Sequence, residues 1–504
     1  MKVDTAGAAA NTLAPEEKVV IMGAGPAGLT AAWELVHNGV SVEILEADPD
    51  LVGGIARTAS YKGFRFDIGG HRFFTKAEEV KKLWHEILDE DDWLTVPRLS
   101  RIYYNGKFFS YPLRAMDALT KLGIFQTAAC LLSYFKAKVF PRKSEASFED
   151  WVINRFGERL YRIFFKTYTE KVWGMSCREI SADWAAQRIK GLSLKEAIRN
   201  AFKGSGKSKG GEIIKTLIEQ FEYPRFGPGM MWEVAAEKVQ KKGAALHMAS
   251  PVMRLHRAAS GLTGVEADTP DGPKIFEGAQ FISTLPIKQL VEMMEPPAPQ
   301  EVRKAAGALS YRDFFTVVLI VNQKELFPDN WIYIHEPSVK LGRIQNFKNW
   351  SPFMVPDESK SALGLEYFCN IGDELWNKSD EELIDLGSME VDKLGLCRRQ
   401  DIEDGTVVRM PKTYPVYDGT YEQNVLVVRR FIEAELPNLQ LSGRNGMHKY
   451  NNQDHSMMTA LLAARNILGE DWDPWKVNTD AEYHEEVRED HDTSGRMIPR
   501  AIKS

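Results

Sequence analysis

The sequence feature that most constrains the fold is a glycine-rich turn near the N-terminus, flanked by a strand and a helix. Lys18–Met22 is a short apolar run without alternation, which is typical of a strand buried on both faces of a parallel sheet. Gly23-Ala-Gly25-Pro-Ala-Gly28 follows directly, and Pro26–His37 has the periodicity of a helix. A second strand, Val40–Leu45, completes a β-α-β unit of about 30 residues. The pattern predicts an α/β fold with a parallel sheet.

Each glycine of this turn has a physical role in binding a dinucleotide. Gly23 permits the tight turn, Gly25 lets the backbone approach a pyrophosphate, and Gly28 lets the helix pack on the strand. The first amides of the helix, including that of Ala27, then face the phosphates. Glu46 ends the second strand, where its carboxylate can bind the hydroxyls of the adenosine ribose. The alternative is a glycine-rich turn without a ligand, which the flanking strand and helix disfavour.

A second group of glycines indicates which dinucleotide is bound. Gly53-Gly54, Arg57 and Phe66-Asp-Ile-Gly-Gly70-His71 follow soon after the second strand. A nicotinamide-binding fold would continue into its next β-α-β repeat, whereas these loops suit a long, extended FAD. We therefore expect Gly54, Arg57 and Gly70 to contact FAD. His71 either contacts the flavin ring or packs within a hydrogen-bonded loop, and both interpretations stay open.

Charge and motif content exclude several other classes of protein. With 64 Lys and Arg against 70 Asp and Glu, the net charge of -6 offers nothing that attracts nucleic acid. The 4 cysteines lie far apart and form no CxxC pair, which excludes a cysteine-rich zinc site and fits a reducing cytoplasm. No GxSxG, HExxH or dense His/Cys set occurs, so we expect no metal site.

The apolar runs are too short for a membrane-spanning helix. No stretch of about 18 uninterrupted apolar residues occurs, so we expect no transmembrane segment. The nearest approach is Leu122–Phe135, which we interpret as a core helix, with peripheral membrane contact as the alternative. The first residues lack a continuous apolar core and indicate a loose tail. We therefore expect a cytoplasmic protein that binds a small-molecule substrate, and homo-oligomerisation stays open.

Further along the chain, a helical part precedes a strand-rich part. From Gly70 to Phe202 the pattern is mostly helical. Short strands are then expected over residues 247–255, 261–267, 274–283, 314–321, 331–335, 342–347 and 363–369. A last helix is expected from Ser456 to Leu468, with Asp454 or Ser456 as its N-cap.

The N-terminal motifs resemble those of a large flavoprotein superfamily. Val-Val-Ile-x-Gly-x-Gly-x-x-Gly-Leu, Glu46 and Gly53-Gly54-x-x-Arg57 are similar to the pattern shared by amine oxidases, protoporphyrinogen oxidase and UDP-galactopyranose mutase. Val252, with the later Ile282-Ser-Thr-Leu-Pro286, is similar to the strand pair that covers the FAD adenine in that superfamily. The resemblance implies that Val252 lies against FAD.

Four further segments look more like UDP-galactopyranose mutase than like the oxidases. They are Gly69-Gly70-His71; Phe165-Lys-Thr-Tyr168-x-x-Lys-Val-Trp173 with Trp184-Ala-Ala-Gln-Arg188; Asn330-Trp-Ile-Tyr333 with Arg343-Ile-Gln-Asn-Phe-Lys-Asn-Trp-Ser-Pro352; and Tyr414-Pro415 with Gly443-Arg444 to Ser456. The last of them implies flavin contacts from Gly443, Arg444, Asp454 and Ser456. The substrate residues that the resemblance implies are Arg188, Tyr333, Arg343, Tyr414, Tyr450 and Asn452.

The chemistry of a nucleotide-diphosphate substrate agrees with two of these residues. Such a substrate carries about two negative charges, and planar guanidinium groups bind its oxygens better than lysine does. Arg188 and Arg343 therefore join His71 as the expected catalytic residues. Tyr333, Tyr414 and Tyr450 can contact phosphate or sugar hydroxyls, although aromatic residues are first of all core material. For any one arginine, the alternative is an ordinary ion pair.

We expect a two-domain α/β flavoprotein. A Rossmann-like, GxGxxG-containing FAD-binding domain is expected over residues 16–112, 212–290 and 425–470, between tails at 1–15 and 471–504. A substrate domain of helices and antiparallel sheet is inserted as residues 113–211 and 291–424. The resemblance implies a mutase in which N5 of reduced FAD is the nucleophile toward a nucleotide sugar. The alternatives are an FAD-dependent oxidoreductase and a non-catalytic escort protein of the same fold.

Overall fold

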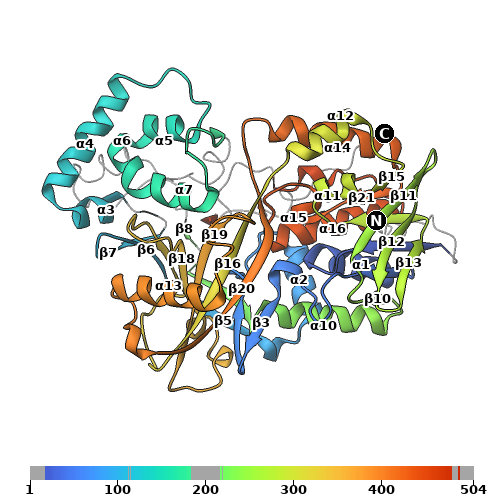
Figure 1. Ribbon diagram of the computed structural model, residues 1–504, viewed down its shortest axis with the longest axis horizontal. Helices are drawn as coiled ribbons and strands as arrows, with labels where there is room; N and C mark the ends of the chain where they lie inside the picture. Colours follow the sequence, from blue (N-terminus) through green and yellow to red (C-terminus); the bar gives the residue numbers. More distant parts are fainter. Residues whose placement is uncertain are drawn as a thin grey trace, which may run out of the picture.

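The computed structural model describes residues 17–111, 113, 115–182, 216–217, 219–478 and 486–487, and a parallel sheet carries the glycine-rich turn (Figure 1). The strand order is β10-β2-β1-β14-β21, and every neighbouring pair is parallel. These strands span Lys18–Met22 (β1), Ser41–Leu45 (β2), Ala245–His247 (β10), Gln280–Ser283 (β14) and Leu439–Leu441 (β21). The predicted β-α-β unit is confirmed, with α1 at Pro26–His37.

Both faces of this sheet are covered, which explains the unbroken apolar sequence of β1. Val19 and Ile21 belong to one core, and Val20 and Met22 belong to another on the opposite face. The first core is covered by α1, α2 (Glu78–Ile87), α10 (Pro228–Lys241) and α16 (Gln453–Ile467). The second is covered by β11 (Val252–Ala258), β12 (Gly261–Thr269), β13 (Gly272–Glu277), β15 (Met294–Glu295), α11 (Ile287–Glu292), α12 (Gln300–Ala308) and α14 (Tyr421–Glu435).

A second large sheet has the order β20-β16-β19-β18-β17-β6-β7. Its neighbouring strands are antiparallel except for the parallel pair of β6 and β17. Its strands are β6 (Ser100–Tyr104), β7 (Lys107–Ser110), β16 (Tyr311–Val321), β17 (Trp331–Ile334), β18 (Arg343–Asn346), β19 (Ser361–Cys369) and β20 (Ile402–Pro415). Helix α13 (Asp380–Lys393) covers one face of this sheet.

A group of helices lies at one corner of the molecule, above the second sheet in Figure 1. It comprises α3 (Ala115–Leu122), α4 (Ile124–Val139), α5 (Phe148–Phe156), α6 (Glu158–Leu160), a π-helical turn (Tyr161–Lys166) and α7 (Thr167–Trp173). Smaller elements are β3 (Thr58–Tyr61), β4 (Phe64–Asp67), β5 (Trp93–Pro97), β8 (Thr216–Leu217), β9 (Gln220–Pro224), α15 (Gly443–Gly446) and β22 (Glu486–Val487). None of the helices within the described ranges is both long and apolar enough to cross a bilayer.

The structure corrects several of the predictions. The stretch from Gly70 to Phe202 is not mostly helical at its start, because β5, β6 and β7 occupy residues 93–110 and the last two join the second sheet. The sequence pattern also missed the long strand β20. Helix α4 is not a pure core helix, because much of its apolar surface is exposed. Arg188 lies outside the described residues.

Candidate active site

The three glycines of the turn between β1 and α1 differ in how closely other atoms approach them. A Cβ added at Gly23, where φ is +103°, would lie 2.3 Å from Oγ1 of Thr284, and one added at Gly28 would lie 1.8 Å from the carbonyl oxygen of Gly23. At Gly25 the nearest atom to such a Cβ is Cα of Gly54, at 3.8 Å. The space over Gly25 and Gly54 is therefore free of side chains, and it fits a pyrophosphate lying at the start of α1.

Glu46 is held beside this turn by the backbone. Its carboxylate accepts hydrogen bonds from the N–H of Ala24 at 2.7 Å and from the N–H of Asp48 at 2.9 Å. Burial raises the pKa of Glu46 from its ordinary value, and the two backbone hydrogen bonds oppose that shift. Arg57, which the sequence placed on FAD, forms an ion pair with Asp48. Val252 is buried at the start of β11.

The glycine pair before His71 exposes one stretch of backbone in a buried segment. Ile68 and Gly69 are buried, Gly69 has φ +89°, and Gly70 is exposed. Burial, together with the nearby positive charges of Arg444 and Arg343, lowers the pKa of His71 to about 3, so its imidazole is neutral at physiological pH. Within the described residues, its buried Nδ1 has no hydrogen-bond partner. An exposed glycine beside an unpartnered ring nitrogen fits a flat polar ring such as a flavin.

The C-terminal motif packs against the dinucleotide turn. Gly443 has φ +82°, and a Cβ added there would lie 3.0 Å from Cβ of Ala27 in α1. The next residue, Arg444, donates from Nε to the carbonyl oxygen of Asn451 at 2.8 Å and from Nη1 to that of Thr413 at 3.2 Å. Because its partners are carbonyl groups, its positive charge is available to a bound anion.

Helix α16 begins one residue after Asn452. Asn452 is the N-cap, and its backbone N–H donates to Nδ1 of His455 at 3.2 Å. The predicted N-cap at Asp454 or Ser456 is wrong, because both residues are buried within the first turn of the helix. Asn452, expected to contact substrate, has a structural role at this position.

Arg343 is fixed by a buried carboxylate on the neighbouring strand. It lies directly opposite Glu366 in the antiparallel pair of β18 and β19. Its Nε donates to Oε1 of Glu366 at 2.9 Å, and Nη2 donates to Oε2 in a fork-shaped ion pair. Gln345 adds a hydrogen bond of 2.6 Å to the same Oε1. Despite its own burial, the adjacent carboxylate holds the pKa of Arg343 well above its usual value.

Three tyrosines, Tyr168, Tyr333 and Tyr414, lie near this pair, and Tyr450 extends the group behind Tyr414. The ring of Tyr168, from α7, lies 5.5 Å from that of Tyr333, and the rings of Tyr414 and Tyr450 stack at 5.6 Å. Arg444 lies over both stacked rings, 5.1 Å from the centre of Tyr450. Burial raises the pKa of Tyr168 and of Tyr414, so both hydroxyls stay protonated and can donate hydrogen bonds.

Sequence reasoning missed three charged residues near this cluster. The guanidinium of Arg72 lies 5.8 Å from the ring centre of Trp331, and that of Arg98 lies 5.6 Å from it. Arg72 follows His71 directly, so its position in the motif was a usable signal. Glu366 was also detectable, because it is a lone charge within β19, a strand whose residues are all buried.

Comparison with known proteins gives a family match over most of the chain. A family model described as "Flavin containing amine oxidoreductase" matches residues 26–468. Among curated relatives, a "Probable UDP-galactopyranose mutase" of Klebsiella pneumoniae is 26% identical over 176 residues, which cover 33% of this chain and 43% of that protein. A "dTDP-fucopyranose mutase" of Escherichia coli is 28% identical over 169 residues, covering 33% and 44%. The chain thus matches less than half the length of these relatives.

Solved structures agree on the fold over nearly the whole chain. The crystal structure of a reduced UDP-galactopyranose mutase aligns with a TM-score of 0.76 at 22% identity, over 90% of this chain and 96% of that one. A putative protoporphyrinogen oxidase from Exiguobacterium aligns with a TM-score of 0.67 at 17% identity, over 90% and 98%. At these identities the likeness shows the fold, and it confirms the predicted mixed α/β class. The chain belongs to the family of flavin-containing amine oxidoreductases and is an FAD-dependent enzyme.

Proposed function

We propose that this enzyme is a mutase that uses reduced FAD to interconvert the pyranose and furanose forms of the sugar in a nucleotide sugar. The observation that carries the proposal is the set of tyrosines around Arg343, which Glu366 fixes close to the Gly69-Gly70-His71 loop. Two curated relatives bear the names of such mutases. When bound in its reduced form, FAD supplies the nucleophile toward the sugar, and no electrons are consumed overall.

In this proposal, Arg343 binds the diphosphate of the substrate. Glu366 occupies Nε and Nη2 of the guanidinium, and among the described residues no hydrogen bond engages Nη1. Because Glu366 offsets the charge of Arg343, a diphosphate with about two negative charges requires further cations. We assign this role to Arg188, with Arg72 and Arg98 as additional guanidinium groups beside Trp331.

The tyrosines orient the sugar and exclude water. The protonated hydroxyls of Tyr168 and Tyr414 can donate to phosphate or sugar oxygens, and Tyr333 and Tyr450 extend the aromatic wall on either side. Neutral His71 contributes a hydrogen-bonding group beside the flavin without adding charge. Asn452 caps α16, so we assign it to positioning that helix.

The FAD-binding residues are proposed on the same grounds of geometry. The set comprises Gly23, Gly25, Ala27, Gly28, Glu46, Gly54, Gly70, Val252, Gly443, Arg444, Asp454 and Ser456, with Arg57 acting through Asp48. The domain division at residues 16–112, 212–290 and 425–470 is also a proposal. We propose that the first segment of the FAD-binding domain ends near residue 99 rather than at residue 112, because β6 and β7 belong to the sheet that carries Arg343.

One observation favours net oxidoreductase chemistry as a second candidate. The ion pair of Arg343 with Glu366 is neutral as a unit, and neutral tyrosines surround it. Such a wall also suits an uncharged substrate that gives up hydride to the flavin. A chloroplast and mitochondrial protoporphyrinogen oxidase of Arabidopsis thaliana, 24% identical over 205 residues, is among the curated relatives.

The two candidates differ in electron balance, and this difference provides the test. The flavin spectrum of the purified holoenzyme is followed in the dithionite-reduced and air-oxidised states during titration with UDP and UDP-galactose, and the products are separated by chromatography. A mutase binds the nucleotide and rearranges sugar only when reduced, with no change in flavin oxidation state. An oxidoreductase ignores the nucleotides and is bleached by another substrate, and that outcome would overturn the proposal.

A matched pair of variants links the result to the site. Arg343→Lys removes Nη1, the guanidinium nitrogen that Glu366 leaves for the diphosphate, so we expect the Kd for UDP to rise roughly 10- to 100-fold. Arg254→Lys, at an exposed position on β11, is the control and leaves the Kd unchanged. Equal effects of both substitutions would count against a role for Arg343.

A further inference from the structure

Helix α4 is apolar on two opposite faces, and only one of them is covered by protein. Cys130, Tyr134 and Ala137 are buried against the neighbouring helices. The large apolar side chains of the other face are between 53% and 92% exposed, and we call them the α4 stripe: Ile124, Phe125, Leu132, Phe135, Val139 and Phe140. Spacings of three, four and seven residues place most of them along one side of the helix. An apolar row of this size on a folded protein marks a binding surface.

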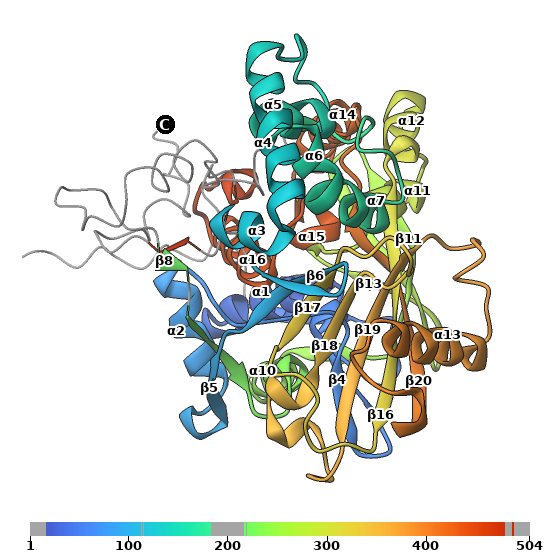
Figure 2. The ribbon, with the colours of Figure 1, turned by 90° about the vertical axis from the view of Figure 1, so that its left-hand side faces the viewer.

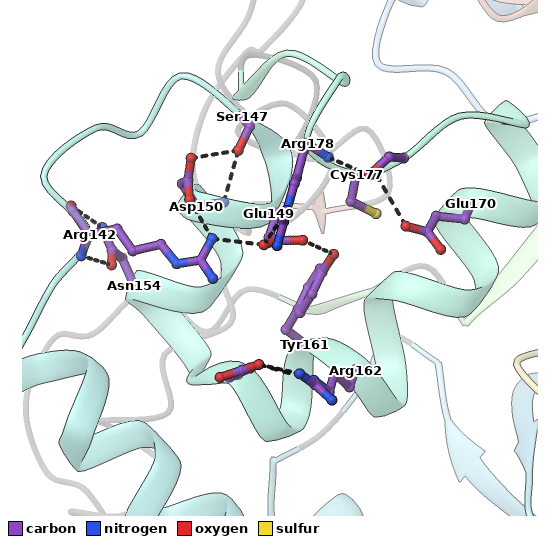
Figure 3. A network of polar contacts seen from close by, with 12 residues as sticks. Arg142, Ser147, Glu149, Asp150, Asn154, Tyr161, Arg162, Glu170, Cys177 and Arg178 are labelled. Carbon is purple, nitrogen blue, oxygen red and sulfur yellow. Dashed lines mark hydrogen bonds and ion pairs between the residues drawn. The ribbon is translucent and has the colours of Figure 1, made fainter.

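The stripe lies on the outer side of a helix whose C-terminal end is held by polar contacts to α5. Helix α4 lies at the outer edge of the helical group, away from the parallel sheet, and is seen in front of α5 and α6 in Figure 2. Figure 3 shows the polar network at its C-terminal end, where Arg142 bonds to Glu149 at 2.9 Å and also pairs with Asp150. The backbone N–H and the carbonyl oxygen of Arg142 are both bonded to the Asn154 side chain, at 2.8 and 3.0 Å. These contacts fix the end of α4 to α5.

The chain segment that carries the stripe has an excess of positive charge. Residues 117–145 contain five basic side chains (Lys121, Lys136, Lys138, Arg142 and Lys143) and two acidic ones (Asp117 and Glu145), although the whole chain has a net charge of -6. Lys121 and Arg142 pair with nearby carboxylates. The other three lysines are exposed, and in the part of the chain that the structure describes they form no ion pair. Apolar side chains flanked by lysines without carboxylate partners form the pattern of a helix that lies on a lipid surface.

We propose that the α4 stripe binds an anionic lipid bilayer, with α4 lying in the plane of the membrane interface. A helix of 16 residues is about 24 Å long, and it would insert its apolar side chains roughly 5–10 Å into the headgroup and acyl boundary. Lys136 and Lys143 would then meet the lipid phosphates, whereas Lys138 donates to the carbonyl oxygen of Asn154 at 3.0 Å. A second copy of the chain is a poorer partner, because a two-fold contact through α4 would bring the same lysines of both copies together. This inference is independent of the proposed reaction.

Vesicle flotation of the FAD-loaded enzyme tests the proposal. Vesicles of phosphatidylcholine alone are compared with vesicles containing one third phosphatidylglycerol. We expect binding to the anionic vesicles and roughly 30-fold weaker binding after Lys136→Gln with Lys143→Gln. Phe125→Ser with Leu132→Ser is expected to weaken it roughly 100-fold. Both residues are more than two thirds exposed, so the flavin spectrum and thermal stability should stay unchanged.

A matched control separates the stripe from apolar exposure in general. Ile275→Ser with Ile371→Ser removes two side chains that are 53% and 57% exposed elsewhere, and it should leave vesicle binding unchanged. Three results would each overturn the proposal: no flotation of the unaltered enzyme, equal loss in the control, or equal binding to neutral vesicles. Sedimentation tests the remaining alternative, which is self-association. If the unaltered enzyme is a dimer that binds no lipid, and Phe125→Ser with Leu132→Ser makes it monomeric, the stripe is a dimer interface.

Discussion

Gly25→Ala should separate FAD binding from folding. Gly25 is the N-cap of α1 with φ -79° and ψ -173°, a conformation that alanine adopts without strain. The added methyl group would meet no protein atom closer than 3.8 Å. It would instead lie against the backbone of Gly54, in the space free of side chains where we place the pyrophosphate. The folded protein can therefore accept the substitution, whereas the cofactor cannot approach the backbone.

The expected magnitudes follow from these distances. Replacing glycine by alanine at an N-cap costs the free protein at most about 1 kcal/mol. Preventing one charge-assisted hydrogen bond to the pyrophosphate costs roughly 1.5–3 kcal/mol, so we expect the Kd for FAD to rise about 10- to 150-fold. Gly28→Ala behaves differently, because its methyl group would lie 1.8 Å from the carbonyl oxygen of Gly23. That clash should cost the fold itself about 3 kcal/mol or more.

FAD titration of the apo-protein and urea unfolding without FAD measure the two quantities separately. Gly307→Ala is the matched control, since Gly307 lies in α12 with no atom within 4 Å of an added Cβ. That variant should keep FAD affinity and gain up to about 1 kcal/mol of stability. Unchanged FAD affinity in Gly25→Ala would refute the placement of the pyrophosphate, and a loss of apo stability equal to that of Gly28→Ala would refute the packing argument.

Two further predictions concern buried carboxyl groups. Glu366→Gln leaves Arg343 without its charge partner and should lower the free energy of urea unfolding by about 3 kcal/mol. The control is Glu403→Gln, in an exposed pair with Lys360, which should change that free energy by less than about 1 kcal/mol. Similar losses of stability in the two variants would contradict the role of burial. Burial raises the pKa of Asp67 to about 8, so between about pH 4 and pH 8 the folded protein holds a proton that the unfolded chain has released. The free energy of unfolding should therefore fall by up to about 5 kcal/mol as the pH rises from about 4 to 8. Thermal melts of Asp67→Asn over the same pH range test this. An unchanged dependence of stability on pH in that variant would show that another group is responsible.

The sequence was most informative where local pattern and function coincide. The β-α-β unit could be predicted because the strand, the glycine turn and the helix adjoin in the chain. The partner of Arg343 could not be predicted in the same way, because Glu366 lies on a neighbouring strand whose register is set by tertiary structure. The prediction that α4 is a core helix was wrong for a different reason. Apolar periodicity shows that a helix has an apolar face, but only its neighbours decide whether that face is covered.

The charges around the site connect the cofactor with the choice of substrate. Glu366 offsets the charge of Arg343, so beyond the one nitrogen that Glu366 leaves unengaged, the anion-binding capacity rests on guanidinium groups that have no buried carboxylate partner. Arg444 is one of these, and its two hydrogen bonds to carbonyl groups hold it over Tyr414 and Tyr450. It also lowers the pKa of His71, which places it within electrostatic reach of the proposed flavin position. In the proposed mutase reaction, the positive charge of Arg444 would therefore stabilise both an anionic reduced flavin and the diphosphate leaving group. With an uncharged substrate, it would stabilise the flavin alone.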